Sequence, residues 1–120
     1  MVKKLFLSGI ALWLAASFAF AQVEMTITGT IIDNQCTPIR TPEKLKDFLK
    51  TYTKEKALMS TCAASGYSIY TSDGRIFRFD KDSNFKILVF LEKKDSKLDV
   101  TVSVDMVGNE LSLVSIANKK

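Results

Sequence analysis

The sequence predicts a small, mainly β domain with helical insertions. In residues 98–106 apolar and polar side chains alternate strictly, which is the period of a strand with one buried face. Asp73-Gly74 lies between two apolar runs and is typical of a two-residue hairpin loop. The predicted order is strand, helical insertion, two strands, helix, two strands. This order indicates a five-stranded OB-fold-like Greek-key barrel, and the alternative is an α+β antiparallel sheet with helices on one face.

The N-terminal segment has the layout of a secretory signal peptide. A basic start precedes the apolar run Leu5–Phe20, and Ala19-Phe20-Ala21 is a small-x-small cleavage site. The run is shorter than the roughly 20 residues of a membrane-spanning helix, so we expect residues 1–21 to be cleaved off. The mature chain, residues 22–120, would then be one periplasmic or secreted domain without stable membrane insertion.

The first predicted strand covers residues 23–31, where apolar residues alternate with Glu24 and three threonines. Gly29 interrupts its apolar face. A glycine there often marks a bulge, or a bend where a strand passes from one sheet to another. The turn residues Asp33-Asn34-Gln35 end this strand.

A helical insertion is predicted at about 41–64. Thr41-Pro42-Glu43 has the composition of a helix start, and apolar residues then recur at helical spacing through Tyr52. A second helical stretch follows at 54–64. The insertion is rich in lysine, and these side chains are read as a solvated helix face rather than a binding patch. They are Lys44, Lys46, Lys50, Lys54 and Lys56.

A further helix is expected at 84–93, with Phe85, Leu88, Val89 and Phe90 or Leu91 facing inward, although the apolar run 87–91 also fits a buried strand. In the preceding run 80–84, oxygen-bearing side chains occupy the positions of the first three ligands of a calcium-binding loop. Phe85 stands where that loop needs glycine, so helix N-cap chemistry is favoured over calcium. A last strand is predicted at 111–116, after a turn at Gly108-Asn109.

The two cysteines, Cys36 and Cys62, both lie in the predicted exported part. Two cysteines in a small exported domain most often pair, because the compartment is oxidising. A disulfide closing this loop would stabilise the fold by roughly 3–4 kcal/mol in the chain-entropy model. The alternative is a thiol or metal-binding function of both cysteines. Because the chain has no histidine and the cysteines are not spaced as Cys-x-x-Cys, no metal site and no cofactor are predicted.

The hairpin supplies the candidate ligand-binding residues. With a two-residue loop at Asp73-Gly74, Tyr70 would face Phe77 and Ser68 would face Phe79, giving one aromatic face. The candidates for contact with a small ligand or protein partner in the cell envelope are Tyr67, Tyr70, Phe77 and Arg78. The competing interpretation is that these aromatic side chains belong to the core.

Composition and motifs argue against catalysis and against nucleic acid. Without histidine the chain has no imidazole base or histidine-based triad, and no nucleophile elbow, phosphate loop or paired-acid motif occurs. The formal net charge is +4, and Lys3 and Lys4 of the predicted leader supply two of these charges. The nearly balanced remainder gives no reason to expect a nucleic-acid partner. We therefore predict a non-enzymatic binding or interaction domain.

Two segments carry a resemblance. Gly29-Thr30-Ile31-Ile32-Asp33-Asn34-Gln35-Cys36 and the Cys-Ala-x-Ser-Gly-Tyr motif of Cys62–Tyr67 resemble a group of small exported bacterial proteins of unknown function. The likeness covers most of the mature chain and implies an exported, OB-fold-like domain without supplying an activity. Those proteins carry a histidine and a further cysteine just ahead of the position of Ala57. Here the places hold Tyr52 and Lys56, so a metal or haem role of such relatives would lack two ligands.

Overall fold

The computed structural model describes residues 24–37 and 41–120. The predicted signal peptide, residues 1–21, and its cleavage site lie outside the described residues. Within the part that is described, no helix is both long and apolar enough to span a membrane.

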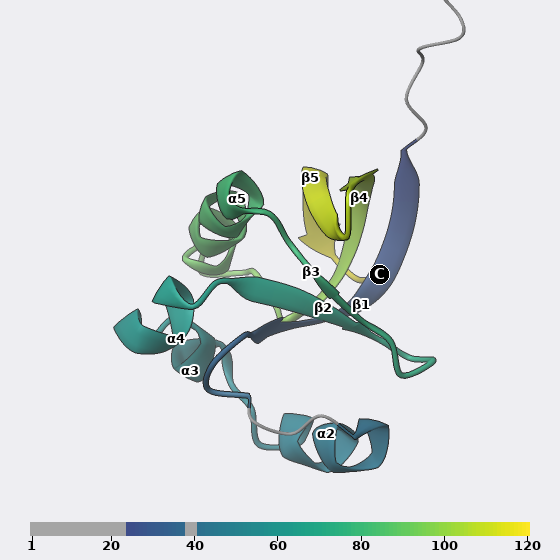
Figure 1. Ribbon diagram of the computed structural model, residues 1–120. Helices are drawn as coiled ribbons and strands as arrows, with labels where there is room; N and C mark the ends of the chain where they lie inside the picture. The colour runs from purple at the N-terminus through teal and green to yellow at the C-terminus, as the bar shows by residue number, and fades with distance from the viewer. Residues whose placement is uncertain (1–23, 38–40) are drawn as a thin grey trace, which may run out of the picture.

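Five antiparallel strands form one sheet in the order β3-β2-β1-β4-β5 (Figure 1). The strands are β1 Met25–Asp33, β2 Tyr67–Thr71, β3 Ile76–Arg78, β4 Asp99–Val107 and β5 Glu110–Asn118. The helices are α2 Pro42–Leu49, α3 Lys54–Ala57, α4 Ser60–Ala64 and α5 Lys81–Leu91. The predicted β-rich domain with helical insertions is confirmed. The sheet is not closed into a barrel.

β1 is the central strand and changes partner along its length. Residues 25–30 pair with β4, and residues 29–33 pair with β2. Gly29 lies in the overlap, and a Cβ atom there would stand 2.4 Å from the carbonyl oxygen of Tyr70. The strand stays within one sheet, contrary to the predicted crossing between sheets. Its glycine is required because the β2 backbone passes too close for any side chain.

The hairpin lies where it was predicted, but its register is wrong by one residue. Ile69 faces Phe77 and Tyr70 faces Ile76, so Tyr70 and Phe77 project from opposite faces. The loop has three residues, because the Thr71 N–H donates to the Arg75 carbonyl (2.9 Å) and only Gly74 has a positive φ, at 88°. This is a type I turn followed by a left-handed glycine.

Side chains around the loop explain the choice of turn. The Thr71 hydroxyl donates to the Asp73 carboxylate, and Arg75 forms an ion pair with the same carboxylate at 2.8 Å. Asp73 is therefore held by local hydrogen bonds in a conformation with negative φ, and the two-residue loop that needs positive φ at both positions does not form.

α5 begins earlier than predicted and buries a different side. Asp80 is the N-cap, and its side chain accepts a hydrogen bond from the Ser83 N–H (2.9 Å), which confirms the capping interpretation. Phe85 is 67% exposed and Val89 is 44% exposed, so the prediction that they face inward is wrong. The buried Ser83 hydroxyl accepts the Leu113 N–H of β5 at 2.7 Å, and this contact sets the rotation of the helix.

The C-terminal hairpin follows the prediction closely. Val100, Val102 and Val104 of β4 are fully buried. β4 pairs with β5 along its length, with one irregularity between Ser103 and Val104. Gly108 has a φ of 64° in the connecting turn, as the first position of a type II′ turn requires.

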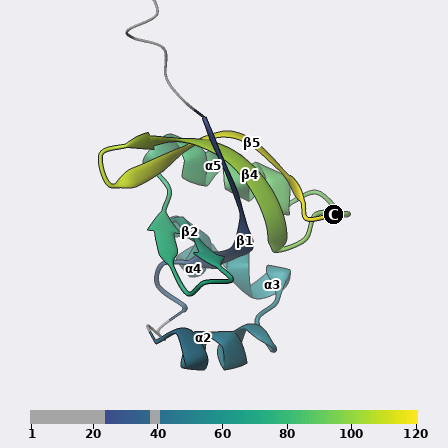
Figure 2. The same ribbon diagram turned by 90° about the vertical axis from the view of Figure 1, so that its right-hand side faces the viewer.

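The insertion consists of three short helices between β1 and β2. The predicted helix at 54–64 is broken into α3 and α4, because Met59 adopts an extended ψ of 139°. α2 and α5 lie on opposite sides of the β1–β2 part of the sheet (Figures 1 and 2). The Lys54 ammonium of α3 donates to the carbonyls of Lys93 and Ser96 beyond α5, at 3.0 and 2.8 Å. The insertion is thereby tied to the rest of the fold.

We predict that Gly29→Ala lowers the free energy of unfolding by about 1–3 kcal/mol, the usual cost of overpacking a closed site. The matched control is Thr26→Ala, which introduces the same residue at an exposed position of β1 and should cost less than about 1 kcal/mol. Urea denaturation followed by circular dichroism measures both. Equal midpoints for Gly29→Ala and the wild type would contradict the close approach.

Candidate functional site

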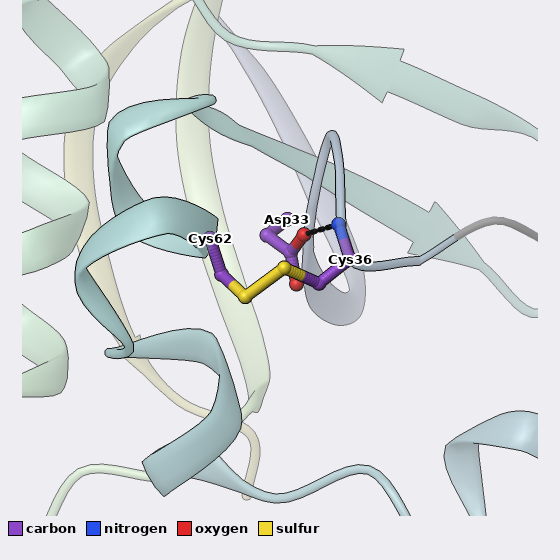
Figure 3. Close-up of side chains that lie close together, drawn as sticks. All are labelled: Asp33, Cys36 and Cys62. Carbon is purple, nitrogen blue, oxygen red and sulfur yellow. Dashed lines mark hydrogen bonds between the residues drawn. A yellow bond between two sulfur atoms is a disulfide. The ribbon is translucent and has the colours of Figure 1, made fainter.

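Cys36 and Cys62 form a disulfide, as predicted (Figure 3). Cys36 lies in the turn after β1 and Cys62 in α4, and their Cα atoms are 5.5 Å apart. They are separated by 26 residues, which span α2 and α3 and run into α4. The bond therefore joins the two ends of the insertion. A disulfide of this kind is typical of proteins in an oxidising, non-cytoplasmic compartment.

Asp33 lies beside the disulfide and is 1% exposed. Its Oδ1 accepts the backbone N–H groups of Gln35 (3.1 Å) and Cys36. Its Oδ2 accepts the Tyr52 hydroxyl at 2.5 Å and the Thr37 hydroxyl at 3.5 Å. Each oxygen thus receives two hydrogen bonds, so the buried carboxylate is well satisfied and orders the turn that carries Cys36.

From the sequence, Asp33 was predicted only to be a turn residue. The sequence signal for the turn at Cys36 is the aspartate at the end of the strand. Aspartate side chains often accept hydrogen bonds from the backbone N–H groups two or three residues further along the chain. The hydrogen bond between Asp33 and Tyr52 had no local signal, since Tyr52 follows 19 residues later, beyond the C-terminal end of α2.

Tyr52 and Tyr67 are held as neutral phenols. Burial, followed by the hydrogen bond to Asp33 and its charge, raises the pKa of Tyr52 well above its ordinary value. Burial and then the charges of Asp33 and Glu92 raise the pKa of Tyr67 to about 12. The Tyr67 hydroxyl donates to the Ala57 carbonyl at 2.8 Å. Both tyrosines therefore connect the sheet to the insertion.

Asp33, Cys36 and Cys62 also form a potential metal-ligand set. One carboxylate oxygen and the two sulfur atoms lie within 4.8 Å of one another. Cysteine binds metals as the thiolate, however, and both sulfur atoms are bonded to each other here. The Asp33 oxygens are also occupied by donors. In the disulfide form the cluster is a structural staple, and a three-ligand set would arise only on reduction.

The predicted ligand-binding residues do not gather on one surface. Tyr67 is 1% exposed and belongs to the core. Tyr70 is half-buried, and its hydroxyl lies 3.4 Å from the Pro42 carbonyl of α2. Phe77 projects from the opposite hairpin face, where the Arg75 guanidinium carbon lies 5.2 Å from its ring centroid. Arg78 is exposed on β3.

Among the surface concavities of the described residues, two involve β1 and β4, and no sequence pattern predicted either of them. One, of about 510 Å³, lies over β1, β4 and β5 and is lined mainly by polar side chains, among them Thr26, Thr28, Thr101, Ser115, Lys119 and Lys120. The other, of about 330 Å³, is a groove between α2 and the β1–β4 pair. Its lining brings together residues far apart in the sequence, which is why no linear pattern indicated it.

The chain matches no protein-family model, and no curated protein and no solved structure shows significant similarity to it. The resemblance to small exported bacterial proteins therefore stays a prediction.

We predict that Tyr52→Phe lowers the free energy of unfolding by about 1.5–3 kcal/mol, the usual contribution of a hydrogen bond to a charged group. The matched control is Tyr70→Phe, which removes only the long contact to Pro42 and should cost much less. Urea denaturation of the oxidised proteins measures both. Similar losses in the two variants would contradict the special role of the Asp33–Tyr52 contact.

Proposed function

We propose that this chain is an exported, non-enzymatic binding domain of OB-fold-like architecture, stapled by Cys36–Cys62. The strand connectivity supports the architecture. β1, β2 and β3 form a meander, α5 follows, and the β4–β5 hairpin returns to the free side of β1. β3 and β5 come together at a single parallel bridge between Phe79 and Leu111, and the Asp80 N–H donates to the Leu111 carbonyl at 2.9 Å. OB-folds bind oligosaccharides and oligonucleotides on the barrel face.

Export is supported by two independent features. The N-terminal segment has the charge and hydropathy pattern of a signal peptide, and the domain contains a disulfide. Periplasmic or secreted location follows from this proposal.

Binding rather than catalysis is supported by the state of the ionisable groups. The chain has no histidine, and the hydroxyls of Tyr52 and Tyr67 are engaged in hydrogen bonds to the Asp33 carboxylate and the Ala57 carbonyl. Asp33 and Asp80 cap backbone N–H groups. The observation that carries the proposal is the groove between α2 and the sheet, because Tyr52, which follows α2 and lines the groove, is hydrogen-bonded to Asp33 at the end of β1. Preformed concavities of this kind are the usual form of a ligand site.

A thiol or metal-binding function is the second candidate, favoured by the proximity of Asp33, Cys36 and Cys62. It requires reduction of the disulfide, after which two thiolates and a carboxylate would be available to a zinc ion. Zinc titration of the reduced protein with a chromogenic competitor measures this. Zinc binding that is lost in Asp33→Asn would favour the second candidate over the first.

The proposed function is tested by expressing the full chain with its N-terminal segment in a bacterial host. We expect the envelope fraction to contain a product that begins at Gln22 and is two hydrogens lighter than the dithiol form by non-reducing mass spectrometry. This product is then incubated with envelope extract and examined by native mass spectrometry, where a stoichiometric, chemically unchanged ligand is expected.

A variant with Tyr70 and Phe77 replaced by alanine serves as the comparison, because it reports whether the hairpin takes part. A cytoplasmic dithiol product, or wild-type protein that retains no ligand, would contradict the proposed function. If the protein chemically converts a component of the extract, the proposal that it is not an enzyme is contradicted.

A further inference from the structure

The groove between α2 and the β1–β4 pair has an apolar floor. Leu49 of α2 and Leu98 just before β4 are half-buried, and both line it. Tyr52 lines it as well and is 7% exposed, with its hydroxyl bonded to Asp33. The ring of Tyr52 can therefore offer apolar surface, while its polar atom is already satisfied.

The polar groups of the groove are unequally occupied. The Asp99 carboxylate accepts the Thr30 hydroxyl at 2.6 Å. Lys50 pairs with Asp47 at 3.2 Å, but both side chains are more than 70% exposed, and such surface pairs contribute little. Lys46 has no hydrogen-bond or ion-pair partner among residues 24–37 and 41–120. Among the residues that line the groove, Lys46 and Lys50 are matched by one carboxylate, that of Asp99, and the Asp47 carboxylate that pairs with Lys50 lies outside the lining.

We propose that this groove binds a small amphipathic organic anion, with a carboxylate or sulfonate head on a short aliphatic or aromatic body. The body would lie on Leu49, Leu98 and the Tyr52 ring, and the head would contact the ammonium groups of Lys46 and Lys50. The proposal rests on the proposed binding function and adds its ligand class. A volume of about 330 Å³ suits a ligand of this size.

The five lysines of the insertion were predicted to form one solvated face, but they fall into three groups. Lys54 is bound to the carbonyls of Lys93 and Ser96. Lys46 and Lys50 are one helical turn apart and line the groove. Lys44 and Lys56 are exposed and do not line it. This division supplies a control of equal charge.

The test uses the oxidised mature protein with two probes, 8-anilinonaphthalene-1-sulfonate and octanoate. Fluorescence titration should give saturable binding of the sulfonate, and octanoate should displace it while the neutral analogue 1-octanol does not. We expect Lys46→Gln/Lys50→Gln to raise the dissociation constant at least about tenfold, and Lys44→Gln/Lys56→Gln to change it less than about twofold. Added salt should weaken binding to the wild type, because the head group is held by charge.

Equal weakening in the two double variants would overturn the proposal, since it would show only the effect of net charge. If 1-octanol displaces the sulfonate from the wild type as effectively as octanoate does, the assigned head-group contact is overturned, and this outcome does not depend on any variant. Circular dichroism and thermal melting confirm that the variants are folded. If Lys46→Gln/Lys50→Gln retains the envelope ligand at wild-type stoichiometry, the groove assignment fails and the binding function stands. If the wild type retains no ligand, the binding function itself fails.

Discussion

The carboxylate of Asp33 is the contact on which the arrangement of the insertion depends. It lies at the end of β1, orders the turn that presents Cys36, and accepts a hydrogen bond from the hydroxyl of Tyr52, which lies just beyond α2. The disulfide then fixes α4 to the same turn. A buried charge is costly unless its oxygen atoms are satisfied, so these hydrogen bonds must form together. The covalent and the hydrogen-bonded connections reinforce each other at one place.

This arrangement gives the insertion a fixed position that a flexible loop would not have. α2 lies beside the β1–β2 part of the sheet (Figure 1), and the groove between α2 and the β1–β4 pair is lined by Leu49, Leu98, Lys46 and Lys50, among others. A loop of this length without such anchors would lose the fixed wall, and a ligand would have to order it on binding. The structural role of the disulfide and the proposed binding role are therefore linked through the position of one helix.

Elements governed by local patterns were predictable from the sequence. The strict alternation in β4, the Pro42 helix start and the Asp80 cap each depend on neighbouring residues, and all three are found. The hairpin register was not predictable, because side-chain hydrogen bonds of Thr71 and Asp73 select the loop length. The rotation of α5 depends on the β5 backbone, 30 residues beyond Ser83. The groove and the Asp33–Tyr52 contact likewise need the tertiary structure.

Hydrogen exchange of the Cys36→Ser/Cys62→Ser variant tests the central role of this anchor most directly. If the turn at Asp33 and the disulfide together hold the insertion, backbone amides of α2, α3 and α4 should exchange at least about tenfold faster than in the oxidised wild type. The amides of Val100, Val102 and Val104 in the middle of β4 should keep their protection. Unchanged protection in the three helices, or an equal loss of protection in β4, would contradict the account.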